Sequence, residues 1–207
     1  MNKLDLFFTE NPEIFARRYI DYLKEVISRI DVGAIGRLVE KLLEARRCGA
    51  TVFFIGNGGS AATASHFAND ISFGTKDYEQ PFRVMSLTDN IAVITALSND
   101  FGYEEVFVRQ LKVHARRGDL VVGISASGNS ENLIKAFMYA HEVGISTFSI
   151  TGFDGGKLKS LAQDGIHVMT ESGEYGPAED AHMVLDHLVG AYLMRAIRNI
   201  DGVDSTQ

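Results

Sequence analysis

Residues Thr51–Phe73 read TVFFIGNGGSAATASHFANDISF, and this stretch decides the fold. Its opening run, Thr51–Ile55, is apolar and rich in β-forming residues, which predicts a buried strand. A glycine-rich turn, Gly56–Gly59, follows it, and Ser60 stands where a helix would begin. Glycines let backbone N–H groups approach an anion closely, and a helix start adds the positive end of its dipole. The stretch therefore predicts a strand, an anion-binding turn and a helix.

The predicted helix also carries an imidazole and a carboxylate. His66 and Asp70 are four residues apart, so both side chains leave the same helical face. Such a pair can exchange protons or bind a metal ion.

Composition restricts the class of protein. The 207 residues are 45% hydrophobic and 23% charged, which is typical of a folded globular chain. A net charge of −7 argues against a nucleic-acid partner but not against an anionic substrate held by N–H groups and hydroxyls. Cys48 is the only cysteine, and we see neither a signal peptide nor an apolar run of membrane-spanning length. We therefore expect a cytoplasmic protein with no membrane partner.

Two amphipathic helices are predicted before this stretch. Apolar residues recur at helical spacing over Pro12–Ile30, with Asn11 as the cap, and over Val32–Cys48, which ends at Gly49. These helices could cover the protein's own sheet or another subunit, and the sequence leaves both alternatives open.

Strands and helices alternate after the stretch. Further strands are predicted over residues 82–87, 119–124, 145–150 and 166–169, and a long last helix over residues 178–200 precedes a frayed tail at residues 201–207. Continuous apolar strands alternating with helices predict an α/β fold, a three-layer αβα sandwich around a five-stranded parallel sheet. With a flavodoxin-like strand order, ligands would bind where that order reverses.

A second polar turn follows the third strand. Ser125, Ser127 and Ser130 place three hydroxyls around Gly128, just before a helix. Hydroxyls, backbone N–H groups and a helix start suit a phosphate monoester. The alternative is an ordinary turn in which Ser130 caps the helix. Both polar turns would lie at one edge of the sheet, which favours phosphate binding.

These motifs resemble those of a known family. IGNGGSAATASHFA, ISASGNSENLIKA, TGFDGGKL and SNDFGYEEVF are similar to segments of the sugar isomerase (SIS) domain, more narrowly of phosphoheptose isomerases, over about residues 34–195. The resemblance implies one SIS domain over residues 1–207, with a helical segment at about 10–48 and an αβα core at about 50–200. It implies isomerisation of sedoheptulose 7-phosphate to a heptose 7-phosphate for bacterial surface polysaccharide, in a homotetramer with active sites at subunit interfaces.

The resemblance also implies roles for individual residues. Substrate and phosphate contacts fall on the two turns and the last helix: Asn57, Gly58, Ser60, Ser125, Ser127, Ser130 and Glu179. The catalytic pair is Asp70, where the family has glutamate, and His187. Zn²⁺ or another divalent ion would be held by His66, Asp70, Glu179 and His187. Glu179 stands where the family has glutamine, so this chain departs from the pattern twice.

The last helix offers further acidic and imidazole groups. Glu179 and His187 are about 80° apart on the helical wheel, so both could face one site, and Asp180 is a reserve candidate for orienting His187. We expect His182 and Asp186 to be structural or interfacial. The histidines at positions 114, 141 and 167 have no partner pattern. If all four proposed ligands bound a metal tightly, no free base would remain.

Two other functions stay open. Asp70 could be a solvated helix charge and His187 a core residue, in which case the chain would resemble non-catalytic SIS regulators, including one that binds the bacterial replication initiator. The chain could also isomerise a different phosphosugar.

Overall fold

The computed structural model describes residues 2–200, with the side chains of residues 199 and 200 left aside; the predicted frayed tail lies outside this range. Five parallel strands form one sheet in the order β2-β1-β3-β4-β5. The strands are β1 (Thr51–Gly56), β2 (Arg83–Ser86), β3 (Leu120–Ser125), β4 (Ser146–Thr151) and β5 (Asp164–His167). The predicted flavodoxin-like order and parallel sheet are confirmed, although β5 begins two residues earlier than expected.

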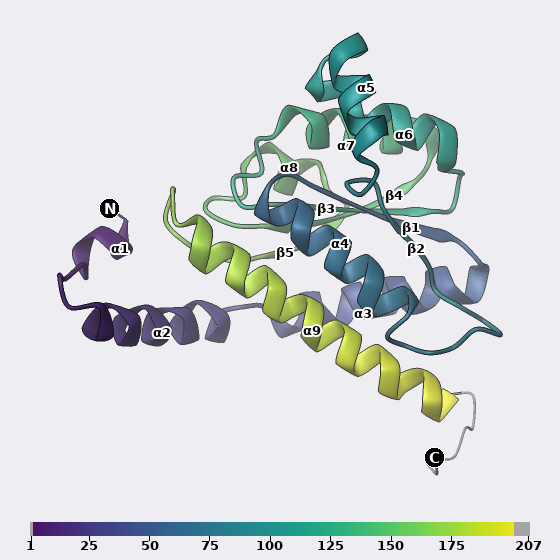
Figure 1. Cartoon of the computed structure of the whole chain (residues 1–207). Coiled ribbons are helices and arrows are strands. Elements are labelled where there is room, and N and C mark those ends of the chain that lie inside the picture. Colours follow the sequence, from purple (N-terminus) through teal and green to yellow (C-terminus); the bar gives the residue numbers. More distant parts are fainter. Residues whose placement is uncertain (1, 201–207) are drawn as a thin grey trace.

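Helices cover both faces of the sheet, as Figure 1 shows. Their bounds are α1 (Lys3–Leu6), α2 (Pro12–Ser28), α3 (Val32–Cys48), α4 (Gly59–Ser72), α5 (Ile91–Phe101), the 3-10 turn η1 (Tyr103–Glu105), α6 (Val106–His114), α7 (Glu131–Val143), α8 (Gly156–Leu161) and α9 (Tyr175–Ile200). The sequence did not predict α1. Asn11 caps α2, and Gly49 ends α3 in the left-handed conformation, both as predicted.

Two apolar cores fill the spaces between the layers. One core joins the sheet to α2, α3, α4 and α9, and Phe54 of β1 stacks on Phe67 of α4 within it. The other core joins the opposite face to α6, α7 and α8. The three-layer prediction is thus confirmed, and α4 and α9 lie next to each other on one face (Figure 1).

The N-terminal helices pack on the start of α9. The carboxylate of Glu174, which is fully buried, accepts hydrogen bonds from the Lys3 N–H at 2.6 Å and from the Tyr22 hydroxyl at 2.5 Å. Helix α3 also packs on β1 and β5, so it covers this chain's own sheet, one of the two alternatives that the sequence left open, whereas α2 packs on α9. No helix among the described residues is long and apolar enough to cross a membrane.

Candidate active site

The reversal of strand order lies between β1 and β3, so the turns that follow these two strands adjoin. Their contact is a pair of amides: Asn57 and Asn132 donate to each other's side-chain oxygen, both at 2.9 Å. The predicted meeting of the two polar turns is therefore present in the structure.

The glycine turn needs its small residues. A Cβ on Gly56 would overlap the backbone of Ser60, so the chain can fold into α4 only without a side chain there. Gly58 precedes α4 with a φ of 54°, which favours glycine. The Ser60 side chain is buried in the first turn of α4. The turn thus presents backbone N–H groups at a helix start, which suits an anion.

The serine turn is held by its own hydrogen bonds. The Ser125 hydroxyl accepts from the Gly128 N–H at 3.0 Å, and the Ser127 hydroxyl accepts from the Asn129 N–H at 3.3 Å. Ser130 stands at the cap position of α7, yet its side chain makes no capping hydrogen bond. Its hydroxyl is therefore available to a ligand, which favours the phosphate interpretation over an ordinary cap.

Helices α4 and α9 run parallel and in register beside each other. Glu179 lies against Gly59, Asp186 contacts His66, and Gly190 lies near Asp70, and each of these three pairs is 120 positions apart. A Cβ on Gly190 would lie 3.6 Å from the Cβ of Asp70, an ordinary van der Waals distance, so the two helices are in contact at this level as well. This register sets which side chains can share a site.

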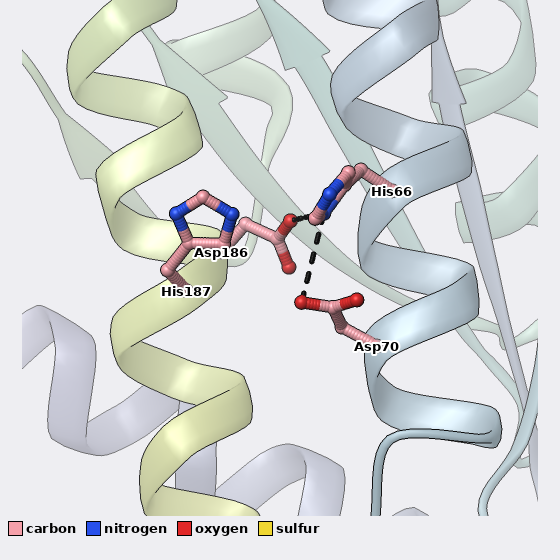
Figure 2. Close-up of side chains that lie close together, drawn as sticks. All are labelled: His66, Asp70, Asp186 and His187. Carbon is pink, nitrogen blue, oxygen red and sulfur yellow. Dashed lines mark hydrogen bonds and ion pairs between the residues drawn. The ribbon is translucent and has the colours of Figure 1, made fainter.

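Four side chains gather between these helices. The ligand atoms of His66, Asp70, Asp186 and His187 all lie within 4.8 Å of one another. Figure 2 shows His66 and Asp70 reaching from α4 toward Asp186 and His187 on α9. The Nδ1 of His66 makes a short hydrogen bond to the Asp186 carboxylate and lies 3.6 Å from Asp70 Oδ2. The rings of His66 and His187 meet edge to face, with centroids 5.1 Å apart.

Asp186 is the most perturbed acid of this cluster. Its side chain is fully buried, and Oδ1 has no hydrogen-bond partner among the described residues. Burial raises the pKa of Asp186 to about 6; the hydrogen bond from His66 opposes this rise and the nearby charge of Asp70 adds to it. A buried, half-satisfied carboxylate beside an imidazole is typical of a functional site.

The structure corrects the interpretation of Asp186. We expected it to be structural or interfacial, but it contacts His66 within the cluster. The wheel contained a usable signal: Asp186 lies seven residues from Glu179 and so only about 20° away from it. Asp186 therefore lies on the same face of the helical wheel as Glu179 and belonged among the candidate site residues.

Glu179 lies outside the cluster. Its carboxyl group packs against Gly59, the first residue of α4, so closely that a Cβ on Gly59 would overlap it. Seven residues separate Glu179 from Asp186, a rise of about 10 Å along α9. The sequence argument considered the angle around the helix and neglected this rise. Burial, and then the charge of Asp180, raise the pKa of Glu179.

The remaining polar residues of α9 have other neighbours. Asp180, the reserve candidate for orienting His187, accepts a hydrogen bond from the Tyr19 hydroxyl of α2 at 2.5 Å, so it belongs to the packing of α2 on α9. His182 is fully buried, and neither ring nitrogen has a hydrogen-bond partner among the described residues. Burial lowers the pKa of His182 to about 4.

Sequence comparisons define the class of protein. The SIS domain profile matches residues 18–152, so the chain belongs to the SIS domain family. It is 36% identical to a protein from Thermoplasma volcanium named probable phosphoheptose isomerase, over 83% of this chain and 86% of that one. It is 32% identical to the phosphoheptose isomerase of Aquifex aeolicus, over 91% of this chain and 93% of that one.

A solved structure agrees with these relatives. The phosphoheptose isomerase of Neisseria gonorrhoeae superposes with a TM-score of 0.78 at 30% identity, covering 88% of this chain and 97% of that one. The resemblance seen in the sequence motifs is therefore confirmed at the level of the family and the fold.

Proposed function

We propose that this protein is an aldose–ketose isomerase that converts sedoheptulose 7-phosphate to a heptose 7-phosphate. Relatives at 32–36% identity carry the name phosphoheptose isomerase. The observation that carries the proposal is the cluster between α4 and α9, where two imidazoles and two carboxylates meet. A non-catalytic regulator would not need such a cluster.

The reaction needs one proton removed from the carbon beside the carbonyl and one delivered to its neighbour. Asp70 and His187 serve as the acid–base pair, because each projects into the cluster from a different helix. Asp186 orients His66: a carboxylate at Nδ1 keeps the proton on that nitrogen and leaves Nε2 free to accept.

The cluster also fits a divalent cation. Its two carboxylates balance a double positive charge, and mixed imidazole and carboxylate donors suit Zn²⁺ or a similar ion. The unpartnered Oδ1 of Asp186 is a buried acceptor that a cation would satisfy. We assign His66, Asp70, Asp186 and His187 as the residues that would hold it, with Asp186 in place of Glu179; Asp70 or His187 would have to loosen from the ion to act as the base. A bound ion would polarise the sugar carbonyl and favour negative charge on its oxygen.

The spacing of turn and cluster suits a long phosphosugar. His66 lies seven residues after Gly59, about 10 Å along the α4 axis. The N–H groups of the glycine turn, together with Ser60 and Ser130, hold the phosphate at one end. The carbonyl at the other end of a seven-carbon chain then reaches the cluster.

Self-association is part of the proposal. The outer face of α9 carries Val184, Leu188 and Tyr192, large apolar residues that are 36%, 45% and 55% exposed, next to His187. Helix α5 is apolar, yet none of its residues is buried within the described chain. Both surfaces support a homotetramer whose interface adjoins the cluster. Light scattering of Leu188→Glu, compared with the native chain, tests this assignment.

Replacing the proposed acid–base histidine tests the function. Wild-type protein, His187→Gln and the control His114→Gln are mixed with sedoheptulose 7-phosphate, and aldose formation is followed by NMR. His114 lies at the end of α6, on the other side of the sheet from α9. We expect no turnover in His187→Gln, sugar-phosphate affinity near that of wild type, and full activity in the control. Full activity in His187→Gln contradicts the acid–base assignment, and an inactive wild type that binds the sugar favours a regulator.

A further inference from the structure

A row of three polar side chains crosses the edge of the sheet where the two turns meet. Tyr103 of η1 donates its hydroxyl hydrogen to Asn57 Oδ1 at 2.8 Å, and Asn57 pairs with Asn132 of α7. These residues line a cavity of about 330 Å³ together with Ser130, Glu104 and Glu131. Neither Tyr103 nor Asn132 was a candidate from the sequence.

The hydrogen bonds fix the orientation of each amide. The Leu133 backbone N–H donates to one side-chain atom of Asn132 at 3.0 Å, so that atom is the oxygen Oδ1. The Asn57 atom facing this oxygen must then be Nδ2, and its Oδ1 receives the Asn132 N–H. Because Oδ1 of Asn57 is an acceptor, the Tyr103 hydroxyl must be the donor in their bond.

This arrangement restricts what Asn57 can do for a ligand. Both acceptor positions of its oxygen are used, one by Asn132 and one by Tyr103, while its Nδ2 still has one N–H to offer. The amide can therefore only donate. A donor facing a cavity that also contains the available Ser130 hydroxyl suits the oxygen atoms of a phosphosugar.

Tyr103 is held in place from two sides. Lys135 of α7 pairs with Glu105 at 2.9 Å and with Glu104 at 3.7 Å, which fixes η1 to the helix that carries Asn132. Gly102 precedes η1 with a φ of 95°, a conformation that favours glycine and turns the chain sharply after α5. The pairing with Lys135 also offsets the charge of Glu104 beside the cavity.

We propose that Tyr103 is a positioning residue for the phosphosugar: it acts through Asn57 and keeps that amide as an N–H donor to the ligand. This inference rests on the proposed function of the site. Without the hydroxyl, Asn57 Oδ1 regains a free acceptor position and the amide can rotate, so the ligand loses a preorganised donor.

Steady-state kinetics of Tyr103→Phe test the proposal, with Tyr78→Phe, an exposed tyrosine in the loop after α4, as the matched control. We expect KM for sedoheptulose 7-phosphate to rise about 3- to 10-fold, as for one lost hydrogen bond, with kcat within about twofold of wild type. Thermal stabilisation by inorganic phosphate alone should not change, because inorganic phosphate can also bind to the N–H groups of the glycine turn. Unchanged KM, or a fall in kcat with KM constant, overturns the proposal.

A double-mutant cycle with Asn57→Ala identifies the route of action. If Tyr103 acts through Asn57, Tyr103→Phe has less than a twofold effect on KM in the Asn57→Ala background. Additive effects overturn the proposal while leaving the isomerase assignment intact. Absence of both turnover and binding in the wild type overturns the proposed function first, and this inference with it.

Discussion

Replacing the buried carboxylate by Asp186→Asn should stabilise the metal-free protein and weaken its function. Asp186 has a pKa of about 6 in the folded chain against an ordinary value of 3.8. At 1.36 kcal/mol per pH unit, this difference corresponds to about 3 kcal/mol. An acid whose folded pKa is raised contributes stability that is fully present below pH 3.8 and is lost as the pH rises through about 6.

The variant therefore changes stability in a pH-dependent way. At pH 7.5 the native Asp186 is ionised and costs about 3 kcal/mol that asparagine does not cost; at pH 4 the native side chain is protonated in the folded chain and most of this advantage disappears. The difference between the two pH values cancels any packing effect of the substitution that does not depend on pH. Because pH 4 lies just above the ordinary pKa of 3.8, slightly less than the full difference is recovered there, and we expect the free energy of unfolding to favour Asp186→Asn by about 2.4 kcal/mol more at pH 7.5 than at pH 4.

Urea unfolding in EDTA, at one protein concentration and at several pH values, measures this difference. Asp180→Asn is the control for removal of a carboxylate from the exposed side of the same helix. With divalent metal present, the same Asp186→Asn variant should bind the ion about 10- to 100-fold more weakly and lose activity accordingly. An effect of equal size at both pH values would refute the claim that burial raises the pKa of Asp186.

Three further substitutions have definite expected outcomes. His182→Leu should make stability less sensitive to acid, because the folded pKa of His182, about 4, lies below the ordinary 6.5. The native protein therefore loses stability as the pH falls through this range, by about 2.4 kcal/mol between pH 7 and pH 4.5, which urea unfolding of the metal-free protein at these two pH values measures. Glu179→Gln should lower KM for the sugar phosphate about 3- to 10-fold, since it removes a negative charge beside the anion-binding turn; a higher KM would show that the carboxylate binds substrate instead. Gly128→Ala should destabilise the chain by more than about 2 kcal/mol, because its φ is 63° and a Cβ would overlap the backbone of Gly155; Gly36→Ala, with open space around it, is the matched control in thermal unfolding and should not destabilise.

The sequence predicted the sheet because each strand is a local signal. The apolar run at Thr51–Ile55 is bounded by a glycine turn, and the structure places β1 over Thr51–Gly56. The crossover rules placed the strand-to-helix turns at one edge, whereas the flavodoxin-like strand order was an assumption that the structure confirms. The short helix α1 was missed because four residues carry too little periodicity.

The site was less predictable because it depends on how two distant helices align. A helical wheel gives the angle of a side chain around the helix axis but not its position along the axis. The position of Glu179 along the axis, relative to α4, is set by tertiary packing. Packing of α9 on α4 sets the offset that pairs Gly59 with Glu179 and His66 with Asp186. Tyr103 was missed for a similar reason, since its partner Asn57 is 46 residues away.

The parallel register of α4 and α9 connects phosphate binding to proton transfer. Gly59, the first residue of α4, lies beside Glu179, the fifth residue of α9, so the proposed anion-binding end of α4 has a carboxylate beside it, and the cluster lies two turns further along both helices. A substrate must then carry its phosphate and its carbonyl about 10 Å apart, which a triose phosphate cannot do. The charge of Glu179 opposes a bare anion at the turn, which the expected fall in KM of Glu179→Gln tests. In the proposed site, preference for a long phosphosugar would therefore follow from helix register, without a dedicated binding loop.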